Sequence, residues 1–355
     1  MSSVEEQINE IIKEIRETPY NKATQLHIGR LKAKLAKLRE EAERSTTKKG
    51  SSYAPKKAGD ATCILVGFPS VGKSTLLNAL TNAKSLVGAY DFTTLNVIPG
   101  SMVHKGAHIQ IFDVPGLVSG AVSGKGRGKE VISVIRNADL ILLVIDVFSE
   151  HQIQTLKEEL YNAGIRLNEH PPNATIIKRA RGGITINKTL RSELDDNTIK
   201  AILREYKIHN ADVILREDMS VERFIDALMT NRRYLPSVTV VNKIDQLNDN
   251  LHFGDICVSA KEDINIDKLK DLMFEKLAFI RIYMKPPGGG PDRVHPLILR
   301  RNVTVENVCN VLHRDFSRKF KYAQVWGKSV RFPGQRVGTD HVLCDEDIVT
   351  LNIQK

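Results

Sequence analysis

The chain has 355 residues, 41% hydrophobic and 26% charged, a composition typical of a globular protein with two or three domains. Its longest apolar run, Leu140 to Ile145, is too short to span a membrane, so we expect no transmembrane helix. Its N-terminus is acidic and helical, so we expect no signal peptide. Four scattered cysteines without a Cys-x-x-Cys pair predict buried thiols in a reducing cytoplasm, not a zinc site or a disulfide framework.

The net charge of +10 is unevenly distributed. Residues 1–60 carry 13 Lys and Arg against 9 Asp and Glu, residues 165–235 carry 13 against 10, and residues 281–355 carry 13 against 7. The remaining residues carry 13 against 16. This distribution favours an acidic partner, with RNA as the leading candidate, although solubility alone is the alternative explanation.

The first sixty residues predict a helical hairpin and a linker. Apolar residues recur at helical spacing from Val4 to Ile15, and again from Ile28 to Ala42, on either side of a break at Thr18–Asn21. The charged outer face of this hairpin is either solvated or a contact for RNA or a partner. Residues 45–59 have the composition of a flexible basic linker.

The strongest motif is Gly67–Ser74, which fits the phosphate-binding pattern of Gly, four residues, Gly, Lys and Ser or Thr. A β-prone segment, Cys63–Val66, precedes it, and a helix start, Thr75–Leu80, follows it. In this context the loop amides and the helix N-terminus bind phosphate. Lys73 should reach the β- and γ-phosphates, and the Ser74 hydroxyl should ligate Mg²⁺.

A β-hairpin is predicted next, with arms at Thr94–Val103 and His108–Phe112 and a turn at Lys105-Gly106. The second arm ends in Asp113-Val114-Pro115-Gly116, where Asp113 is placed to hold Mg²⁺ and the Gly116 amide to meet a γ-phosphate.

Five glycines between residues 116 and 128 then favour a mobile loop. This loop is either a nucleotide-dependent switch or a passive linker. Thr94 is the preferred residue for contacting both Mg²⁺ and the γ-phosphate, and Thr93 is the alternative.

Two later loops suit a guanine base. The buried parallel strand Val238–Val241 ends in Asn242-Lys243-Ile244-Asp245, and Asp255–Val258 ends in Ser259-Ala260-Lys261. The Asp245 carboxylate can accept from N1–H and the 2-amino group of guanine, a donor pair that adenine lacks. The aliphatic stem of Lys243 can cover one face of the base.

In sequence order, Gly67–Ser74, Thr94, Asp113–Gly116, Asn242–Asp245 and Ser259–Lys261 resemble the five guanine-nucleotide motifs of a small GTPase domain. Residues 90–94 and the glycine-rich loop are similar to those of the Obg-related group. Over nearly its full length the chain resembles the DRG family, the developmentally regulated GTP-binding proteins of archaea and eukaryotes, in its archaeal form.

The resemblance implies an α/β fold built on a P-loop GTPase domain, with a mostly parallel sheet and helices on both faces. It implies a helical hairpin and basic linker at 1–60, a GTPase domain at 61–164 and 236–280, an inserted ribosomal-protein-like α/β subdomain at 165–235, and a C-terminal TGS domain of β-grasp fold at 281–355.

It also implies GTP, GDP and Mg²⁺ as ligands. Potassium is left open, because potassium-dependent relatives often carry Asn where this chain has Ser70. Catalytic roles fall on Lys73, Thr94 and Gly116, and metal contacts on Ser74, Thr94 and Asp113. Nucleotide contacts are expected from Gly67, Pro69, Ser70, Val71, Gly72, Lys73, Ser74, Thr75, Asn242, Lys243, Asp245, Ser259, Ala260 and Lys261.

The stretch from Ser149 to Pro236 is longer than one crossover helix requires. Within it, Ala174–Lys178 and Gly183–Ile186 are predicted to form a short β pair around Arg179 and Arg181. These arginines either touch phosphate or form a solvated tip. Helices are predicted near residues 198–206 and 221–231.

The C-terminal residues predict strands at 282–284, 295–299, 321–326 and 347–353, and a helix capped by Thr304. Basic and aromatic residues interleave here, as in RNA-binding surfaces. We expect most of the rings to be core and several of the cations to contact RNA. The rings are Phe316, Phe320, Tyr322, Trp326 and Phe332, and the cations are Arg314, Arg318, Lys319, Lys321, Lys328, Arg331 and Arg336.

These features predict a cytoplasmic, monomeric GTPase that hydrolyses GTP slowly to GDP and phosphate and acts on the ribosome or structured RNA. Leu117 stands where many GTPases place a water-orienting glutamine, which is the reason for expecting a low rate. The family resemblance adds a dedicated regulatory protein partner. The alternative is an RNA- or protein-binding adaptor in which GTP is mainly a structural ligand; a small-molecule kinase is disfavoured by Asp245.

Overall fold

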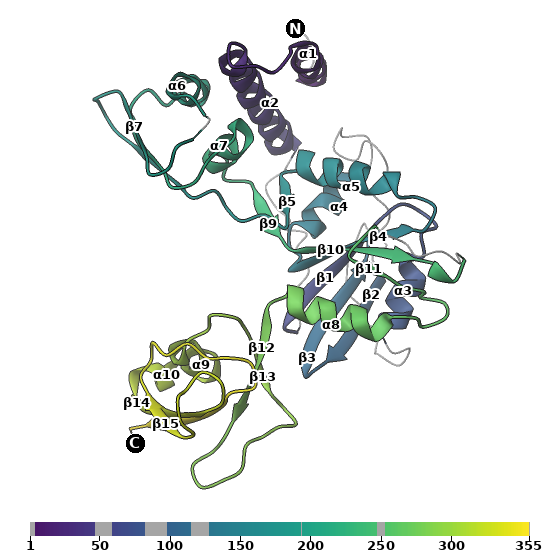
Figure 1. Ribbon diagram of the computed structural model, residues 1–355, viewed down its shortest axis with the longest axis vertical. Helices are drawn as coiled ribbons and strands as arrows, with labels where there is room; N and C mark the ends of the chain where they lie inside the picture. The colour runs from purple at the N-terminus through teal and green to yellow at the C-terminus, as the bar shows by residue number, and fades with distance from the viewer. Residues whose placement is uncertain are drawn as a thin grey trace. The chain divides into compact units, whose positions relative to one another are not determined.

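The computed structural model describes residues 4–46, 59–81, 98–114, 128–192, 194–246 and 253–354. The chain divides into two compact units (Figure 1). One comprises Met1–Ser52 with Gly164–Tyr234, and the other comprises Tyr53–Ala163 with Leu235–Lys355. No helix of the described residues is long and apolar enough to cross a membrane.

The second unit contains a six-stranded sheet in the order β11-β10-β4-β1-β3-β2. All neighbouring strands pair in parallel except β2, which pairs antiparallel with β3. The sheet is therefore mostly parallel, as predicted. Its strands are β1 (Ala61–Val66), β2 (Ile98–His104), β3 (Ala107–Asp113), β4 (Leu140–Asp146), β10 (Ser237–Asn242) and β11 (Ile256–Cys257).

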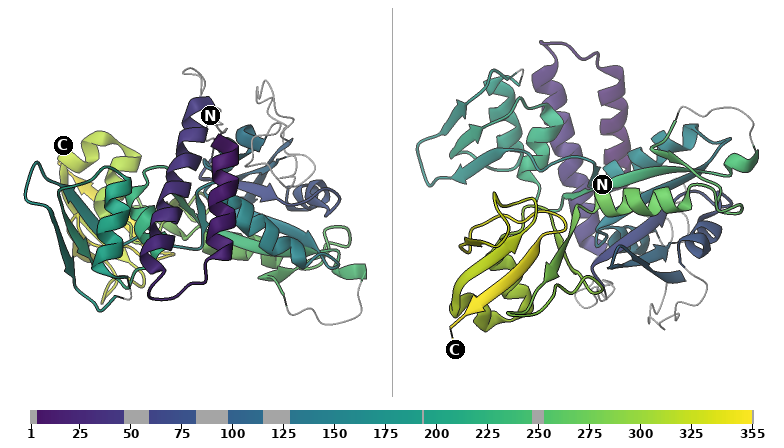
Figure 2. Two further views of the ribbon diagram at one scale, coloured as in Figure 1. Left: turned by 90° about the horizontal axis from the view of Figure 1, so that it is seen from above. Right: turned by 60° about the horizontal axis from the view of Figure 1, so that its bottom comes forward.

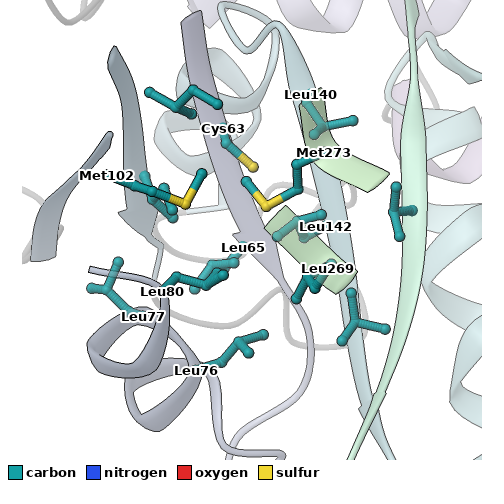
Figure 3. Close-up of a cluster of buried hydrophobic side chains, with 14 of the residues drawn as sticks. Cys63, Leu65, Leu76, Leu77, Leu80, Met102, Leu140, Leu142, Leu269 and Met273 are labelled. Atoms are coloured by element: carbon teal, nitrogen blue, oxygen red, sulfur yellow. The ribbon is translucent and has the colours of Figure 1, made fainter. Parts of the chain in front are cut away.

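Helices cover both faces of this sheet (Figure 1). They are α3 (Lys73–Leu80), α4 (Gly128–Ile135), α5 (His151–Asn162) and α8 (Ile266–Lys276), and a 3₁₀ turn, η2 (Ile244–Gln246), follows β10. Figure 3 shows leucines of α3 and the side chains of Leu269 and Met273 from α8 gathered around Cys63 and Leu65 of β1. Alternate residues of β1 face opposite helical layers, so every β1 residue is apolar or buried.

The predicted hairpin is present as β2 and β3, whose register closes at His104↔Ala107 around the turn Lys105-Gly106. Its first arm begins at Ile98 in the structure, and the expected residues 94–97 lie outside the described ranges. β3 ends at Asp113, directly beside Leu65 of β1. This pairing places the predicted magnesium ligand next to the start of the phosphate loop.

The C-terminal part of this unit is a five-stranded sheet in the order β13-β12-β16-β14-β15, with α9 packed against it. Thr304 caps α9 in a capping box with Asn307, as predicted for the cap. The prediction missed β15 and α10. The elements are β12 (Phe279–Met284), β13 (Leu297–Arg300), α9 (Val305–Leu312), α10 (Arg314–Arg318), β14 (Phe320–Trp326), β15 (Gln335–Val337) and β16 (Ile348–Ile353).

The first unit begins with the predicted hairpin of α1 (Val4–Glu17) and α2 (Gln25–Thr46), which run side by side in Figure 2. Ala33 of α2 is fully buried in the hydrophobic cluster of the inserted segment. Ion pairs join Arg30 to Glu205 at 3.1 Å and Lys32 to Glu222. The hairpin and the inserted segment therefore share one core.

The predicted β pair of the inserted segment is wrong in its pairing. β6 and β7 do not pair with each other, because β8 lies between them, antiparallel to β6 and parallel to β7. The predicted helices are present as α6 and α7. The elements are β5 (Ile165–Leu167), β6 (Ala174–Lys178), β7 (Ile184–Lys188), α6 (Asp196–Glu205), β8 (Ala211–Leu215), α7 (Val221–Leu228) and β9 (Arg233–Leu235), and β5 pairs with β9.

The cysteines only partly follow the expectation of buried thiols. Cys63 and Cys309 are buried, Cys257 is half-buried and Cys344 is exposed. Burial raises the pKa of the Cys257 and Cys309 thiols, so both disfavour the thiolate form.

Candidate nucleotide-binding site

The phosphate loop connects β1 to α3 and depends on two glycines. A side chain at Gly67 would place its Cβ 2.2 Å from the carbonyl oxygen of Val144, and one at Gly72 would place it 2.4 Å from Asn242 Nδ2. Gly72 also has a φ of 91°, in the left-handed region that favours glycine. The glycine positions of the motif thus have a steric reason in this fold.

Lys73 lies at the first position of α3 and is 9% exposed. Its Nζ donates to the carbonyl oxygens of Gly67 at 3.0 Å and Phe68 at 2.9 Å. Burial lowers the pKa of Lys73, and the nearby Asp113 carboxylate opposes that shift. The loop therefore curls around one buried ammonium group held by neutral acceptors.

Ser74 and Asp113 are in direct contact. The Ser74 hydroxyl donates to Asp113 Oδ2 at 2.6 Å, and Asp113 is only 6% exposed. The other oxygen, Oδ1, is buried and has no hydrogen-bond partner within the ranges that the structure describes. A buried acceptor left unpaired costs about 1–3 kcal/mol, so this oxygen is suited to a ligand. Hydroxyl and carboxylate oxygens fit Mg²⁺, which prefers such donors.

Asn242, at the end of β10, joins the two halves of the site. Its Nδ2 donates to the carbonyl oxygen of Val71 at 3.0 Å, and its Oδ1 accepts from the amide of Ala260 at 3.0 Å. The side chain is buried, at 2% exposure. The phosphate loop and the second base loop are therefore held at a fixed separation by one amide group.

Lys243 lies beside this joint and is held by two acceptors. Its Nζ donates to the carbonyl oxygen of Ser70 at 2.7 Å and pairs with Asp146 Oδ2 at 3.3 Å. Burial pushes the pKa of Asp146 upward, but hydrogen bonds from Ser149 and Lys243 outweigh it and hold the pKa below its usual value. Asp146 stays ionised and positions the lysine whose stem is expected to cover the base.

Asp146 is a site residue that sequence reasoning missed. It ends β4, and the parallel register pairs it with Asn242 at the end of β10. The available signal was the polar residue that ends the apolar run Leu140–Ile145, next to a strand that also ends in a functional residue. Carboxyl ends of adjacent parallel strands meet at one sheet edge, which is where ligands bind in open α/β sheets.

Asp245 lies in η2 and is exposed, with Oδ1 accepting from the Ser259 hydroxyl at 2.6 Å. Ser259 is fully buried and also accepts from the amide of Glu262 at 3.2 Å. The carboxylate is therefore oriented before any base arrives. Selectivity for guanine over adenine requires the Asp245 carboxylate to be buried, and because it is exposed here, the bound base itself must cover it.

The remaining residues predicted to contact the nucleotide differ in whether they are exposed or already hydrogen-bonded within the protein. Pro69, Ser70 and Thr75 are exposed at the loop, whereas the Ala260 amide is already bound to Asn242. The Lys261 side chain is exposed and pairs with Glu262 at 3.1 Å, and this hydrogen bond raises the pKa of Lys261. Thr94 and Gly116, with Thr93 and Leu117, lie outside the described residues.

The two arginines of the inserted segment that were expected either to touch phosphate or to be solvated differ in their contacts. Arg179 forms an ion pair with Asp212 at 2.6 Å, and Arg181 is exposed.

The expectation that most of the aromatic rings of the C-terminal domain are core is wrong. Phe316 and Phe320 pack against the core, whereas Phe332 is 59% exposed, and Tyr322 and Trp326 alternate along β14 with the core residues Ala323 and Val325.

Three family models match the chain in succession. Residues 62–179 match a model described as 50S ribosome-binding GTPase. Residues 181–279 match the C-terminal region of that GTPase domain, and residues 280–352 match the TGS domain.

Full-length relatives give the same result. A GTP-binding protein of Methanocaldococcus jannaschii is 55% identical over 99% of this chain and 93% of its own length. A GTP-binding protein of Halobacterium salinarum is 48% identical over 98% of each chain. Human developmentally-regulated GTP-binding protein 2 is 44% identical, again over 98% of each. With its phosphate loop, its guanine-type loops and its TGS domain, the chain belongs to the family of developmentally-regulated GTP-binding proteins.

Proposed function

We propose that this chain is a slow GTPase switch that binds GTP together with Mg²⁺ and acts on the ribosome or another structured RNA. The observation that carries the proposal is the buried Asp113 carboxylate, which holds Ser74 through Oδ2 and has no partner for Oδ1 among the described residues. Beside a loop that presents Lys73, such an oxygen suits the hard cation that accompanies a nucleoside triphosphate.

The phosphates of GTP would lie in the loop Gly67–Ser74. Lys73 Nζ would exchange its two carbonyl acceptors for phosphate oxygens, because hydrogen bonds between two charged groups are the stronger ones. Amides of the loop and of the first turn of α3 would complete the anion site. Ser74 and Asp113 would hold Mg²⁺, which when bound neutralises charge on the β- and γ-phosphates.

The base would lie against Asp245 and the stem of Lys243. Ser259 fixes the carboxylate in advance, and Asp146 with the Ser70 carbonyl fixes the lysine. Guanine offers N1–H and a 2-amino group to this carboxylate, whereas adenine would leave it covered and unpaired. Preorganisation of both groups lowers the cost of ordering them when the base binds.

Hydrolysis would proceed by in-line attack of water on the γ-phosphorus. A bond forms from the water oxygen to phosphorus, the bond to the β–γ bridging oxygen breaks, and the proton lost by the water leaves with phosphate. Leu117 offers the water no hydrogen bond, so turnover without a partner should be far below the rates of about 5–20 s⁻¹ of assisted GTPases. A group supplied in trans, or a cation such as potassium, would complete the site.

Two observations support the ribosome or a structured RNA as the target: the distribution of charge and the family model that the chain matches. The family model over residues 62–179 is described as a ribosome-binding GTPase, and positive charge is concentrated outside the nucleotide module. We further propose that the protein is monomeric and cytoplasmic and has a dedicated regulatory partner.

Co-sedimentation of the full chain with ribosomes, in GDP and in a non-hydrolysable GTP analogue, tests the switch. We expect several-fold more protein in the pellet with the analogue. The variant Lys73→Ala serves as the control, because it removes the cation that holds the triphosphate and should pellet equally in both nucleotides. Equal pelleting of the wild type would instead favour an adaptor with GTP as a structural ligand.

A further inference from the structure

We infer that the C-terminal sheet carries a stacking platform for single-stranded RNA on its outer face, the face away from α9. This inference rests on the proposed RNA-binding role, and it adds which surface of the protein binds the RNA and that the RNA is single-stranded. Six residues of this outer face form the proposed platform: Lys285, Tyr322, Gln324, Trp326, Arg336 and Asn352.

The alternation of β14 defines the outer face. Ala323 and Val325 are fully buried in the core that α9 covers. Successive side chains of a strand point to opposite faces, so Tyr322, Gln324 and Trp326 point to the outer face, where each is half-buried. Tyr322 and Trp326 lie four positions apart on one strand, roughly 13 Å, which suits an extended strand of several nucleotides and not one nucleotide.

The sheet register adds polar residues around these rings. Asn352 of β16 pairs with Tyr322, and Arg336 of β15 pairs with Gln324. The Asn352 Nδ2 group is buried and has no hydrogen-bond partner within the described part of the chain. This amide group lies beside the Tyr322 ring and has a free hydrogen-bond donor. It can donate to an acceptor on a nucleotide once the side chains that cover it move aside.

Each ring carries a cation on its face. The Lys285 ammonium lies 4.3 Å from the centroid of the Trp326 ring, and the Arg336 guanidinium lies 4.6 Å from that of Tyr322. Arg336 is exposed, and exposed cation–π contacts are worth only about 0.5–1 kcal/mol, less than the roughly 1–3 kcal/mol of a base stacked on an aromatic ring. A base can therefore replace the cation, which then meets the phosphate of the same strand.

This combination favours RNA over an acidic protein. Two rings with cations at hand match the stacking and phosphate contacts of single-stranded nucleic acid, and no carboxylate stands among the six residues. The domain as a whole carries 13 Lys and Arg against 7 Asp and Glu. A base-paired duplex hides its ring faces, so the platform requires unpaired bases.

Trp326 is the only tryptophan of the chain, so its fluorescence reports on this face directly. The test titrates an oligouridylate of about twelve nucleotides into the GDP-loaded full chain at fixed salt. We expect saturable quenching of the emission. A heparin fragment, which is a polyanion without bases, and a duplex RNA of equal length should leave the emission nearly unchanged. Equal quenching by heparin, or none by the oligonucleotide, would overturn the platform.

Variants separate stacking from charge. Tyr322→Leu should weaken oligouridylate binding by about tenfold, whereas Tyr322→Phe keeps the ring and should bind as the wild type does. Arg301→Gln removes one exposed charge of the same domain outside the six residues and should cost less than Tyr322→Leu. Equal losses in Tyr322→Leu and Arg301→Gln would show that charge alone binds RNA, against the inference.

The ribosome experiment distinguishes this inference from the proposed switch. If ribosome pelleting depends on the nucleotide while the oligonucleotide leaves Trp326 unchanged, the platform is wrong and the switch stands. If the oligonucleotide quenches Trp326 while ribosome pelleting is the same in both nucleotides, the platform stands and the switch is wrong.

Discussion

Among single residues, Asn242 has the role that is hardest to replace. Its amide donates to the phosphate loop at Val71 and accepts from the base loop at Ala260, inside a site where it is almost fully buried. An aspartate would lack the donor and a leucine would lack both groups, and either change would leave a buried backbone group unpaired. One side chain thus sets the spacing between the loop proposed to bind the phosphates and the loop proposed to bind the base.

Exchanging Asp245 for Asn tests the reading of the base. The amide donates where the carboxylate accepted, so we expect GTP affinity to fall by at least about tenfold and xanthosine triphosphate affinity to rise. Competition against a fluorescent guanine nucleotide measures both. Asp263→Asn changes an exposed carboxylate of the neighbouring loop and should leave both unchanged. Unaltered GTP binding by Asp245→Asn would refute the base assignment.

Asp146→Asn tests the ion pair that positions Lys243. We expect GDP to dissociate about three- to fivefold faster, because the lysine loses a charged partner that is largely shielded from water. Stopped-flow release of a fluorescent GDP measures the rate. Asp255→Asn removes the charge of a carboxylate that accepts from the Thr239 amide, towards the opposite end of β10; it is the control and should not change the rate.

The same pair predicts a pH dependence. The pKa of Asp146 is lowered in the folded protein. The stabilisation that ionised Asp146 provides is therefore complete above its unfolded pKa of about 3.9, and it is lost as the pH falls through its folded pKa. The ratio of release rates between Asp146→Asn and the wild type should stay constant from near-neutral pH down to about pH 5. A ratio that collapsed near pH 6.5 would assign the effect to another group.

At the scale of elements, the first unit shows how two distant segments make one core. Ala33 of α2 is buried among residues of α6, α7 and β8, so the hairpin cannot leave without exposing that cluster. The hairpin itself was predictable, because helical periodicity is local. The order β6-β8-β7 was not, because β8 follows α6 and reaches its place only through tertiary packing that periodicity does not encode.

Gly29→Val tests the contact between α2 and α6. Gly29 is buried, and a side chain there would place its Cβ 2.8 Å from Cγ2 of the buried Thr198. We expect a loss of about 1–3 kcal/mol in the free energy of unfolding, measured by denaturant titration. Gly290→Val, where an added Cβ meets no atom within 4 Å, should change little. Adding Thr198→Ala to Gly29→Val should restore part of the loss; no restoration would place the strain elsewhere.

At the scale of the whole molecule, the sequence predicted the mostly parallel sheet and placed the motif loops at its strand ends, because each motif is contiguous and tied to one strand end. Asp146 was missed because its role follows from the register Asn242↔Asp146, a non-local fact. Tyr322 and Trp326 of β14 were misjudged because a small domain was assumed to need most of its rings in the core, whereas Ala323, Val325 and Val349 fill that place. The switch residues Thr94 and Gly116 stay predictions.

The proposed slow turnover belongs to the scale of the whole chain. Without a glutamine after Gly116, single-turnover hydrolysis by the purified protein should stay below about 1 s⁻¹ at saturating GTP and Mg²⁺. Release of labelled phosphate measures the rate, and added potassium tests whether a cation completes the site. A rate of about 5–20 s⁻¹ without any partner would contradict the account of Leu117.

The most direct measurement of the central claim is the affinity of the full chain for GTP and for ATP, each with Mg²⁺ and with a chelator, by calorimetry. The account predicts that GTP binds at least about a hundredfold more tightly than ATP, that chelation weakens GTP binding, and that Asp113→Ala removes this magnesium dependence. Equal affinity for the two nucleotides, or a GTP affinity indifferent to Mg²⁺, would contradict it.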